Sequence, residues 1–584
     1  MRVFRSPILG LQSAPAPASP ALAVSRRPLS LSVLVALLPA AGMWIPSVAE
    51  AQRVQPGASA VWLYPVPGSA AERYARTLEN VGLRSSRALF VRDGGEGWER
   101  RPGDAPGAPA VTPVPPWNDT YRLGLANESR TGLLPLQLGS SYNTAFPFQR
   151  GSGPVWHGRG FTHSLSGGAF GHWGVLSIVL NPVWFRAENR LFPLATTGLE
   201  GDGRFRSPLS PTKLDEPQRF GDEPYSRFSM GNSAIRLQFL GIGLGLSTAP
   251  QKWGGGDLHP MVLGDAGGGV PHLYLGSARP FSVGIGRASL RYVAGQTLES
   301  GWYEHTGPER RRLLNGFVLS FQPRGLRGLE VGASRLFHSA WPTERGGLRT
   351  LLVRPFEGFL KRSLEGVSER DDDQFASVFF RWAVPEDGFE MFGEFLRVDH
   401  SWDARTGVLE PDDQSGYSLG FRKSWLASSG SISTLRGEAI VSGSGHRERG
   451  GARIPQAYRS RPPYWDDPVV GGLTHRGLFL ASAAGPYANG QSLGFDRYQR
   501  NGRWSWDINR FVVRNPTLGA TTEASSGSDV LLIVNGEFVR FVGRWDVTVG
   551  AAWVRNLNRY LISDKTNVGL QFSLSRRFSA IGSG

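Results

Sequence analysis

The sequence predicts an all-β protein: a transmembrane antiparallel β-barrel of about 16–18 strands, preceded by a small helical element. Three observations predict this fold, namely an N-terminal export signal, alternating apolar and polar residues in many later segments, and the overall composition. The 584 residues are 11% aromatic and only 19% charged. This balance suits strands with one face in lipid and aromatic belts at both membrane interfaces. A large soluble β-protein is the alternative.

The first element is a signal peptide over residues 1–51. Arg26 and Arg27 precede an apolar run from Leu29 to Ile45, and Ala49-Glu50-Ala51 supplies the small residues of a cleavage site. A single membrane anchor is the alternative interpretation, but a proline and a glycine interrupt the run. Later in the sequence, no window of about 18 uninterrupted apolar residues occurs. The mature chain is therefore expected to cross a membrane only as a barrel.

Residues 52–117 are predicted to form a periplasmic element made of one helix and a linker. Ser69 and Glu72 have the spacing of a capping box, in which each side chain accepts a hydrogen bond from a free backbone N–H. Apolar residues then recur at helical spacing up to Gly82, which stands where a left-handed C-cap belongs. From residue 100 to 117 the chain is rich in proline and glycine, which is typical of an extended linker.

Residues 118–578 are predicted to form the barrel, followed by a tail over 579–584. Trp545, Val549 and Trp553 share the apolar face of one alternating segment. The same alternation places Arg236 and Arg422 opposite apolar faces, so arginines are expected to point into the lumen. Strands are expected near residues 121–128, 160–170, 173–184, 232–248, 281–297, 313–322, 328–337, 374–384, 389–398, 416–425, 432–442, 473–481, 503–513, 530–541, 543–554 and 566–578. Two of these segments could each split into a hairpin.

The sequence shows no convincing catalytic, cofactor-binding or metal-binding constellation. The string G-x-S-x-G occurs around Ser418 and Ser492, but a nucleophile elbow needs a strand that turns sharply into a helix. Ser418 is expected inside an alternating strand and Ser492 in a loop, so neither context fits. The chain has no cysteine, which excludes disulfides and thiolate metal ligands. We therefore expect a protein that is not an enzyme and needs neither cofactor nor metal.

One polar segment, residues 443–465, carries more binding chemistry than the others. Its arginines are followed by two aromatic residues; the residues of interest are Arg447, Arg449, Arg453, Arg459, Arg461, Tyr464 and Trp465. Guanidinium groups bind carboxylates in a bidentate manner, and aromatic faces stack on sugar rings, so this composition suits an acidic polysaccharide. A solvated loop that contacts lipopolysaccharide phosphates is an equally good interpretation.

Three stretches resemble the capsule assembly Wzi family of outer-membrane proteins. Residues 153–161 are similar to the family's W-x-G-R-G segment, residues 249–275 to its W-G-P-G segment and the residues that follow it, and residues 473–498 to its late H-R-G segment. The matching residues are Trp156, Gly158, Arg159 and Gly160 in the first stretch, Trp253, Gly254, Gly256, Leu263, Ala266, Pro271 and His272 in the second, and Thr474, His475, Arg476, Gly477, Leu493, Gly494 and Asp496 in the third. Gly255, Gly264 and Asp265 depart from the pattern.

The resemblance implies a barrel of about 18 strands with a periplasmic helical part. It also implies a surface lectin that helps to attach capsular polysaccharide to the outer membrane, without catalysis. The candidate polysaccharide-binding residues are Trp156, Arg159, Trp253, His272, His475 and Arg476, together with Arg447, Arg449, Arg453, Arg459, Tyr464 and Trp465 of the arginine-rich segment.

Three functions follow from these observations. The first is an outer-membrane, lectin-like barrel that binds capsular or other surface polysaccharide. The second is a porin for anionic solutes, and a third, remote one is an outer-membrane lipid hydrolase. The expected partners are acidic polysaccharide, outer-membrane lipid, lipopolysaccharide and the assembly machinery that recognises an aromatic terminal strand. The net charge of +15 would permit nucleic acid, but the export signal argues against it, and we expect a monomer.

Overall fold

The computed structural model describes most of the predicted barrel and one helix before it. The described residues are 69–83, 131–148, 151, 153–278, 280–303, 311–342, 347, 352–356, 372–398, 415–442, 464, 471–486, 489–514, 528–576 and 578. All of them belong to the larger of two compact units, which spans residues 57–584. Among these described residues, none lies in a helix long and apolar enough to cross a membrane. The predicted signal peptide, the linker at 100–117 and the tail at 579–584 lie outside the described residues.

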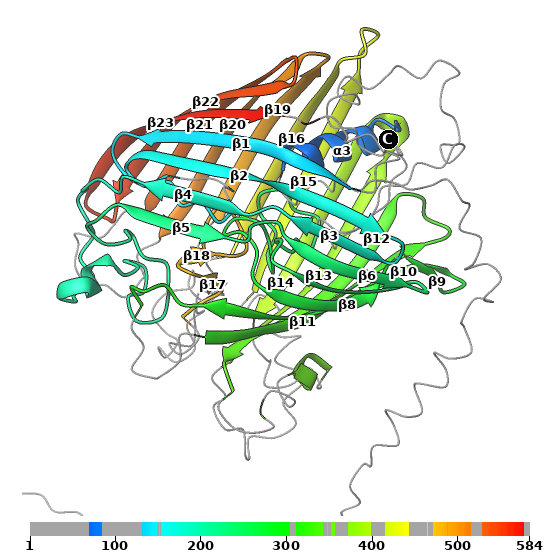
Figure 1. The fold of residues 1–584 in the computed structure, drawn as a ribbon, viewed down its shortest axis with the longest axis horizontal. Coiled ribbons are helices and arrows are strands. Elements are labelled where there is room, and N and C mark those ends of the chain that lie inside the picture. Colours follow the sequence, from blue (N-terminus) through cyan, green and yellow to red (C-terminus); the bar gives the residue numbers. More distant parts are fainter. Residues whose placement is uncertain are drawn as a thin grey trace, which may run out of the picture. The chain divides into compact units, whose positions relative to one another are not determined.

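The described strands form one antiparallel sheet of 21 segments that closes on itself, because β1 pairs with β2 on one side and with the last strand, β23, on the other (Figure 1). The segments are β1 (Thr131–Asn143), β2 (Gly160–Trp173), β3 (Leu176–Leu180), β4 (Val183–Ala187), β5 (Tyr225–Ser229), β6 (Ala234–Phe239), β7 (Ile242–Ser247), β8 (His272–Ser277), β9 (Phe281–Ser282), β10 (Gly286–Leu298), β11 (Arg311–Pro323), β12 (Leu329–Ala340), β13 (Asp372–Val384), β14 (Phe389–Val398), β15 (Ser415–Leu426), β16 (Ile432–Val441), β19 (Asn489–Gln499), β20 (Gly502–Arg514), β21 (Asp529–Val542), β22 (Trp545–Arg559) and β23 (Ser563–Arg576).

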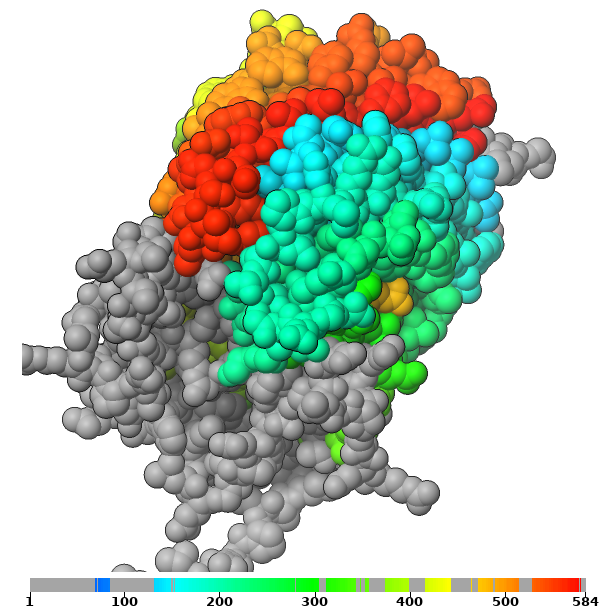
Figure 2. All heavy atoms as spheres, turned by 90° about the vertical axis from the view of Figure 1, so that its left-hand side faces the viewer, coloured from blue at the N-terminus to red at the C-terminus, as the bar shows by residue number. Residues whose placement is uncertain are grey.

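Three of the barrel's strands are interrupted. β3 and β4 are two pieces of one strand, since both pair with β2. β6 pairs with β3 and β5 pairs with β4, so β5 and β6 are the two pieces of the next strand. β8 and β9 both pair with β10. With each interrupted pair counted once, the described residues form a closed barrel of 18 strands. Figure 2 shows the closure from outside, where the red C-terminal strands lie beside the cyan strands that begin the barrel. The predicted fold class and strand number are confirmed.

The two faces of the wall follow the predicted alternation. Along β22, Trp545, Val549 and Trp553 are exposed on the outside, whereas Gly550 and Val554 are buried inside. Arg236 and Arg422 are buried in the lumen, as predicted. The leucine, phenylalanine and tryptophan side chains of the outer face stay exposed among the described residues, which is the arrangement of a lipid-facing wall.

Most predicted strands coincide with observed ones, but several regions differ. The segment 232–248 is a hairpin of β6 and β7, one of the splits that the sequence allowed. The segment 473–481 is wrong as a wall strand, because it forms a short hairpin of β17 (Thr474–His475) and β18 (Leu478–Phe479) in a separate sheet. β1, β5, β8 and β19 were not predicted, because proline, glycine or small polar residues interrupt the alternation of β1, β8 and β19, and β5 is only five residues long. The segment 121–128 lies outside the described residues.

The predicted helix is present as α3 (Ala70–Asn80). The Ser69 hydroxyl accepts a hydrogen bond from the Glu72 backbone N–H at 3.2 Å, and Gly82 has the left-handed φ of 70° expected after a helix. Tyr74 and Leu78 pack against Ile432 and Tyr498 of the wall. The helix therefore lies against the inner surface of the barrel. It sits at the end where the connections between strands are short, such as 240–241 and 543–544.

The opposite end of the barrel carries the long connections, and two of them fold inward. Residues 248–271 and 471–486 bury Trp253, Met261 and Phe479 against apolar residues of β11 to β14. We call α3 with its caps (69–83) and these two inward segments the plug. The three short 3-10 turns, η1 (Gly201–Phe205), η2 (Arg354–Phe356) and η3 (Pro385–Asp387), belong to connections between strands.

Candidate functional site

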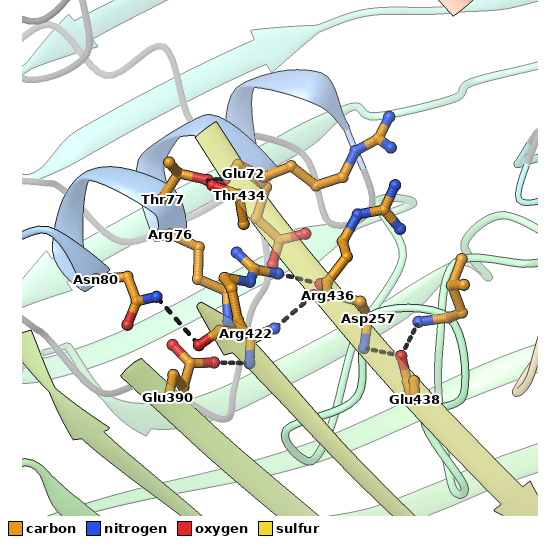
Figure 3. Close-up of polar contacts among 12 residues, drawn as sticks. Glu72, Arg76, Thr77, Asn80, Asp257, Glu390, Arg422, Thr434, Arg436 and Glu438 are labelled. Atoms are coloured by element: carbon orange, nitrogen blue, oxygen red, sulfur yellow. Dashed lines mark hydrogen bonds and ion pairs between the residues drawn. The ribbon is translucent and has the colours of Figure 1, made fainter. Parts of the chain in front are cut away.

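Buried ion pairs fasten α3 to the barrel wall and to the neighbouring plug segment (Figure 3). The Arg76 guanidinium contacts the Asp257 carboxylate at 2.5 Å, donates to the Gly255 carbonyl oxygen at 2.9 Å and contacts Glu390 of β14. Arg381 of β13 contacts the same Glu390 at 2.7 Å. Burial opposes the positive charge of Arg76, but the carboxylates of Asp257 and Glu390 outweigh it, so its pKa is raised.

Wall carboxylates also hold the backbone of plug segment 248–271. The Glu438 carboxylate accepts hydrogen bonds from three successive backbone N–H groups, those of Asp257, Leu258 and His259, at 2.9 to 3.2 Å. Glu394 accepts one from the Met261 N–H at 3.0 Å. These contacts satisfy backbone donors that the irregular segment cannot pair by itself. The segment is thus fixed in the lumen by the wall.

The second inward segment, 471–486, is fastened at its hairpin. His475 Nδ1 accepts a hydrogen bond from the Leu298 N–H at 3.1 Å, and the Arg476 N–H donates to the Leu298 carbonyl at 2.7 Å. Burial, reinforced by the charges of Arg476, Arg227 and Arg312, lowers the pKa of His475 to about 3. The imidazole is therefore neutral at neutral pH, which suits its role as an acceptor.

The candidate residues near the N-terminal part of the barrel serve packing contacts. Trp156 is buried and meets the Phe220 ring edge-on, with ring centroids 5.0 Å apart. Arg159 donates to the carbonyl oxygens of Thr144 and Leu191, and so ties two connections together at the long-loop end. Their role in polysaccharide binding remains a prediction.

The other described candidates lie inside the plug or beside it. Trp253 is fully buried, and His272 is held between the Val270 carbonyl and the Gln251 side chain. Tyr464 is also fully buried, and its hydroxyl donates to the Met261 carbonyl at 2.8 Å. The structure thus distributes the candidates over several packed regions. Arg447, Arg449, Arg453, Arg459, Arg461 and Trp465 lie outside the described residues.

One of the two G-x-S-x-G serines has a histidine partner. Ser492 lies in β19 and not in a loop as predicted, and its hydroxyl is 3.2 Å from His259 Nε2. The other ring nitrogen of His259 is 2.8 Å from the Ser482 hydroxyl. A catalytic triad has a carboxylate at that second position, where a hydroxyl stands here. Ser418 lies in β15, as predicted, and is buried.

A cavity of about 610 Å³ remains between the plug and one part of the wall. We call it the side cavity. The strands β1, β2, β22 and β23 line it only with uncharged residues, among them Gln137, Ser141, Asn143, Thr162, Ser164, Gly550, Gln571 and Ser573. The plug contributes Ser69, Arg73, Lys252, Asp257 and Asp265 to the lining. The sequence analysis missed this cavity, although small polar residues at alternate positions of the first and last strands are its signal.

A second cavity of about 300 Å³ lies at the long-loop end. We call it the outer pocket. Its lining is mainly apolar and aromatic, with Trp156, Phe511 and Tyr560 among its residues. Phe148 and His157 line both cavities and therefore form the boundary between them. His157 Nδ1 lies 2.5 Å from the Ser141 hydroxyl, and burial lowers the pKa of His157 to about 4.

Comparison with known proteins agrees with this architecture. No family model and no curated protein sequence matches the chain. Among solved structures, the chain is similar to Wzi of Escherichia coli, described as a carbohydrate-binding β-barrel involved in group 1 capsule assembly, with a TM-score of 0.50 and 13% identity over 76% of this chain and 85% of that one.

The chain folds as an outer-membrane β-barrel. It also matches OprD of Pseudomonas aeruginosa at 10% identity and a TM-score of 0.34, over 77% of this chain and 93% of that one. OccAB2 of Acinetobacter baumannii matches at 11% identity and a TM-score of 0.36, over 76% and 98% of the two chains. Similarities at this level of identity concern the fold and not the activity.

Proposed function

We propose that the protein is an outer-membrane, lectin-like barrel that binds surface polysaccharide and helps to attach it to the cell. The observation that carries the proposal is the plug. Three segments from different parts of the sequence fill the lumen, and buried ion pairs and backbone hydrogen bonds hold them there. A barrel built mainly to pass solutes would keep a wide aqueous channel along its axis. This lumen is packed with an apolar core instead.

The similarity in fold to Wzi and the three motif stretches support membership of the capsule assembly family as part of the same proposal. In this proposal the long-loop end faces outward, since outer-membrane barrels have short periplasmic turns and longer extracellular loops. The arginine-rich segment 443–465 then belongs to the external connections. An acidic polysaccharide is the ligand that its guanidinium and aromatic groups would bind best.

A porin for anionic solutes is the second candidate, and the side cavity is the observation that favours it. Several arginines of the lumenal wall argue against it, because they are engaged with carboxylates, as Arg436 is with Asp496 and Asp507. A lipid hydrolase fits less well. The Ser492–His259 pair joins β19 to the plug inside the barrel, whereas a lipid substrate would meet the outer face of the wall. We therefore propose a role without catalysis.

The experiment that tests the proposal compares cell-bound with released polysaccharide in the parent strain, a clean deletion strain and the complemented strain. We expect the deletion to shift polysaccharide from the bound to the released fraction at unchanged total, and complementation to restore it. An unchanged distribution, together with large anion-selective current steps of the purified protein in planar bilayers, would favour the porin instead.

A further inference from the structure

We propose that the side cavity and the outer pocket together form a narrow passage for small, uncharged, hydroxyl-rich solutes such as monosaccharides. This function goes beyond polysaccharide attachment and does not depend on it. The passage would run beside the plug, along the wall formed by β22, β23, β1 and β2, with a constriction at Phe148 and His157.

The position of the side cavity supports a route through the barrel. At the short-turn end it is lined by Ser69 and Arg73 of the helical part of the plug. Along β1 its lining extends from Gln137 to Asn143, near the long-loop end of that strand. There it meets the outer pocket, whose lining includes the ends of β20, β21 and β22. The two cavities together thus border the wall from Gln137 of β1 to the long-loop end.

The chemistry of the lining favours uncharged solutes. The wall on this side offers amide and hydroxyl groups, which can replace the water around a sugar without a charge. The charged residues in the lining of the side cavity are mostly neutralised: Lys252 contacts Asp265 at 3.5 Å, and Arg436 contacts Asp507 at 2.5 Å. Asp257 contacts Arg76 and Arg422. A charged solute would lose hydration here without gaining a free counter-charge over most of the path.

Within the side cavity, Arg73 is the exception and provides a test. Among the described residues, no ion pair is found for its guanidinium, and its Nε has no hydrogen-bond partner. An anion-selective route would depend on this cation at the short-turn end. A route for uncharged solutes would not.

A second observation points to a hydroxylated occupant. Thr162 of β2 lines the side cavity and is only 2% exposed, yet its hydroxyl has no hydrogen-bond partner among the described residues. Buried hydroxyl groups are nearly always hydrogen-bonded, because leaving one unsatisfied is unfavourable. Water and the hydroxyl groups of a sugar are the partners that this position suits.

The constriction consists of Phe148 and His157, two residues that hydrogen bonds from side chains of β1 hold in place. The Phe148 carbonyl accepts a hydrogen bond from the Asn143 side chain at 3.1 Å, and His157 is bound to Ser141. The Phe148 side chain itself makes no such polar contact, so truncating it would widen the boundary without removing these hydrogen bonds. Phe148→Ala is therefore expected to open the passage further.

The test measures uptake of labelled glucose and of labelled glucuronate, which differ in charge but little in size, into liposomes that contain the full chain. Wild-type protein should admit glucose severalfold faster than glucuronate. Arg73→Gln should not slow glucose uptake, because the solute carries no charge, and Phe148→Ala should increase it. Faster uptake of glucuronate than of glucose, abolished by Arg73→Gln, would overturn the proposal in favour of an anion route.

A matched pair of variants tests the location of the passage. Gly550→Trp places a ring in the side cavity, where a Cβ on Gly550 would meet nothing closer than 3.5 Å, and should reduce glucose uptake to the level of protein-free liposomes. Gly536→Trp adds the same ring to the outer face of β21, where a Cβ meets nothing within 4 Å, and should have no effect. Equal uptake by both variants would refute the passage.

A second measurement covers the case in which Gly550→Trp does not fold. The chain has no cysteine, so Gly550→Cys supplies a single thiol in the same place. Labelling it with a small neutral thiol reagent should slow glucose uptake, and unchanged uptake after complete labelling would contradict the proposal. Polysaccharide attachment is scored separately on cells. A lost passage with intact attachment, or the reverse, identifies which of the two proposals fails.

Discussion

At the scale of single residues, the lumen depends on charges that are buried in pairs. Arg76 lies between Asp257 and Glu390, and Arg381 lies between Glu79 and Glu390. A buried ion pair contributes little over a well-packed apolar pair, but removing one partner leaves the other charge uncompensated. The value of these pairs is therefore that they fix the position of α3.

Arg76→Met is expected to lower the free energy of unfolding by about 3 kcal/mol, the lower end of the range for broken buried pairs, because both carboxylates keep a second arginine. Urea titration in detergent micelles, followed by tryptophan fluorescence, measures this change. Arg204→Met is the control, since the Arg204–Asp222 pair is half exposed and should contribute less than about 1 kcal/mol. Equal effects of the two variants would show that α3 is not held by its ion pairs.

His475 makes stability depend on pH. Its pKa is about 3 in the folded protein, compared with 6.5 as its ordinary value. The unfolded chain therefore binds the proton first as the pH falls, so stability should decrease from about pH 6.5 downward until the folded-state pKa is reached, by at most about 1.4 kcal/mol per pH unit. His475→Gln, which keeps an acceptor for the Leu298 N–H, should flatten this decline. Unfolding midpoints at pH 7 and pH 5 for both proteins measure the difference, and identical shifts would contradict the assignment.

At the scale of elements, alternation along the sequence predicted which face of the recognised strands, such as β22, meets lipid, because the period of two is fixed by strand geometry. The helix was equally predictable from its caps. The sequence could not show that segment 473–481 folds inside the lumen, since a buried hairpin and a buried wall strand have similar composition. Nor could it show that Trp253, His272 and Tyr464 are packed in the interior, because those contacts join residues far apart in the sequence.

The outer face of β22 allows a direct test of the membrane-facing wall. Val549 is exposed at 51% of its surface and lies between the outward rings of Trp545 and Trp553. Val549→Arg should destabilise the barrel in lipid vesicles by about 2–4 kcal/mol, the range for arginine near the bilayer midplane. Thr548→Arg, on the other face of the same strand, should cost less. Folding titrations of both variants in vesicles give the comparison, and a harmless Val549→Arg would mean that this face does not lie in the membrane core.

At the scale of the whole molecule, the inner wall divides into two parts with different tasks. The part from β11 to β16 carries the buried charges and apolar side chains that hold the plug. The part formed by β22, β23, β1 and β2 is uncharged where it lines the side cavity. One barrel can thus be filled along its axis and still keep a cavity with a polar lining at its wall. This division makes surface attachment and a narrow passage compatible in one chain.

The attachment proposal predicts that the arginine-rich connection binds polysaccharide from outside the packed barrel. A deletion in this connection must stop before Tyr464, because Tyr464 is buried against Phe375 and its hydroxyl donates to the Met261 carbonyl. Deleting residues 446–461, which include Arg447, Arg449, Arg453, Arg459 and Arg461, should therefore leave the barrel folded, as judged by its heat-dependent shift on electrophoresis. The same deletion should release polysaccharide from cells. Replacing the five arginines with lysine in the full chain should leave attachment weaker than in the wild type, because lysine cannot form the bidentate contact. Deleting residues 401–412 of another long connection is the control. If both deletions leave the bound fraction unchanged, attachment does not depend on the arginine-rich connection.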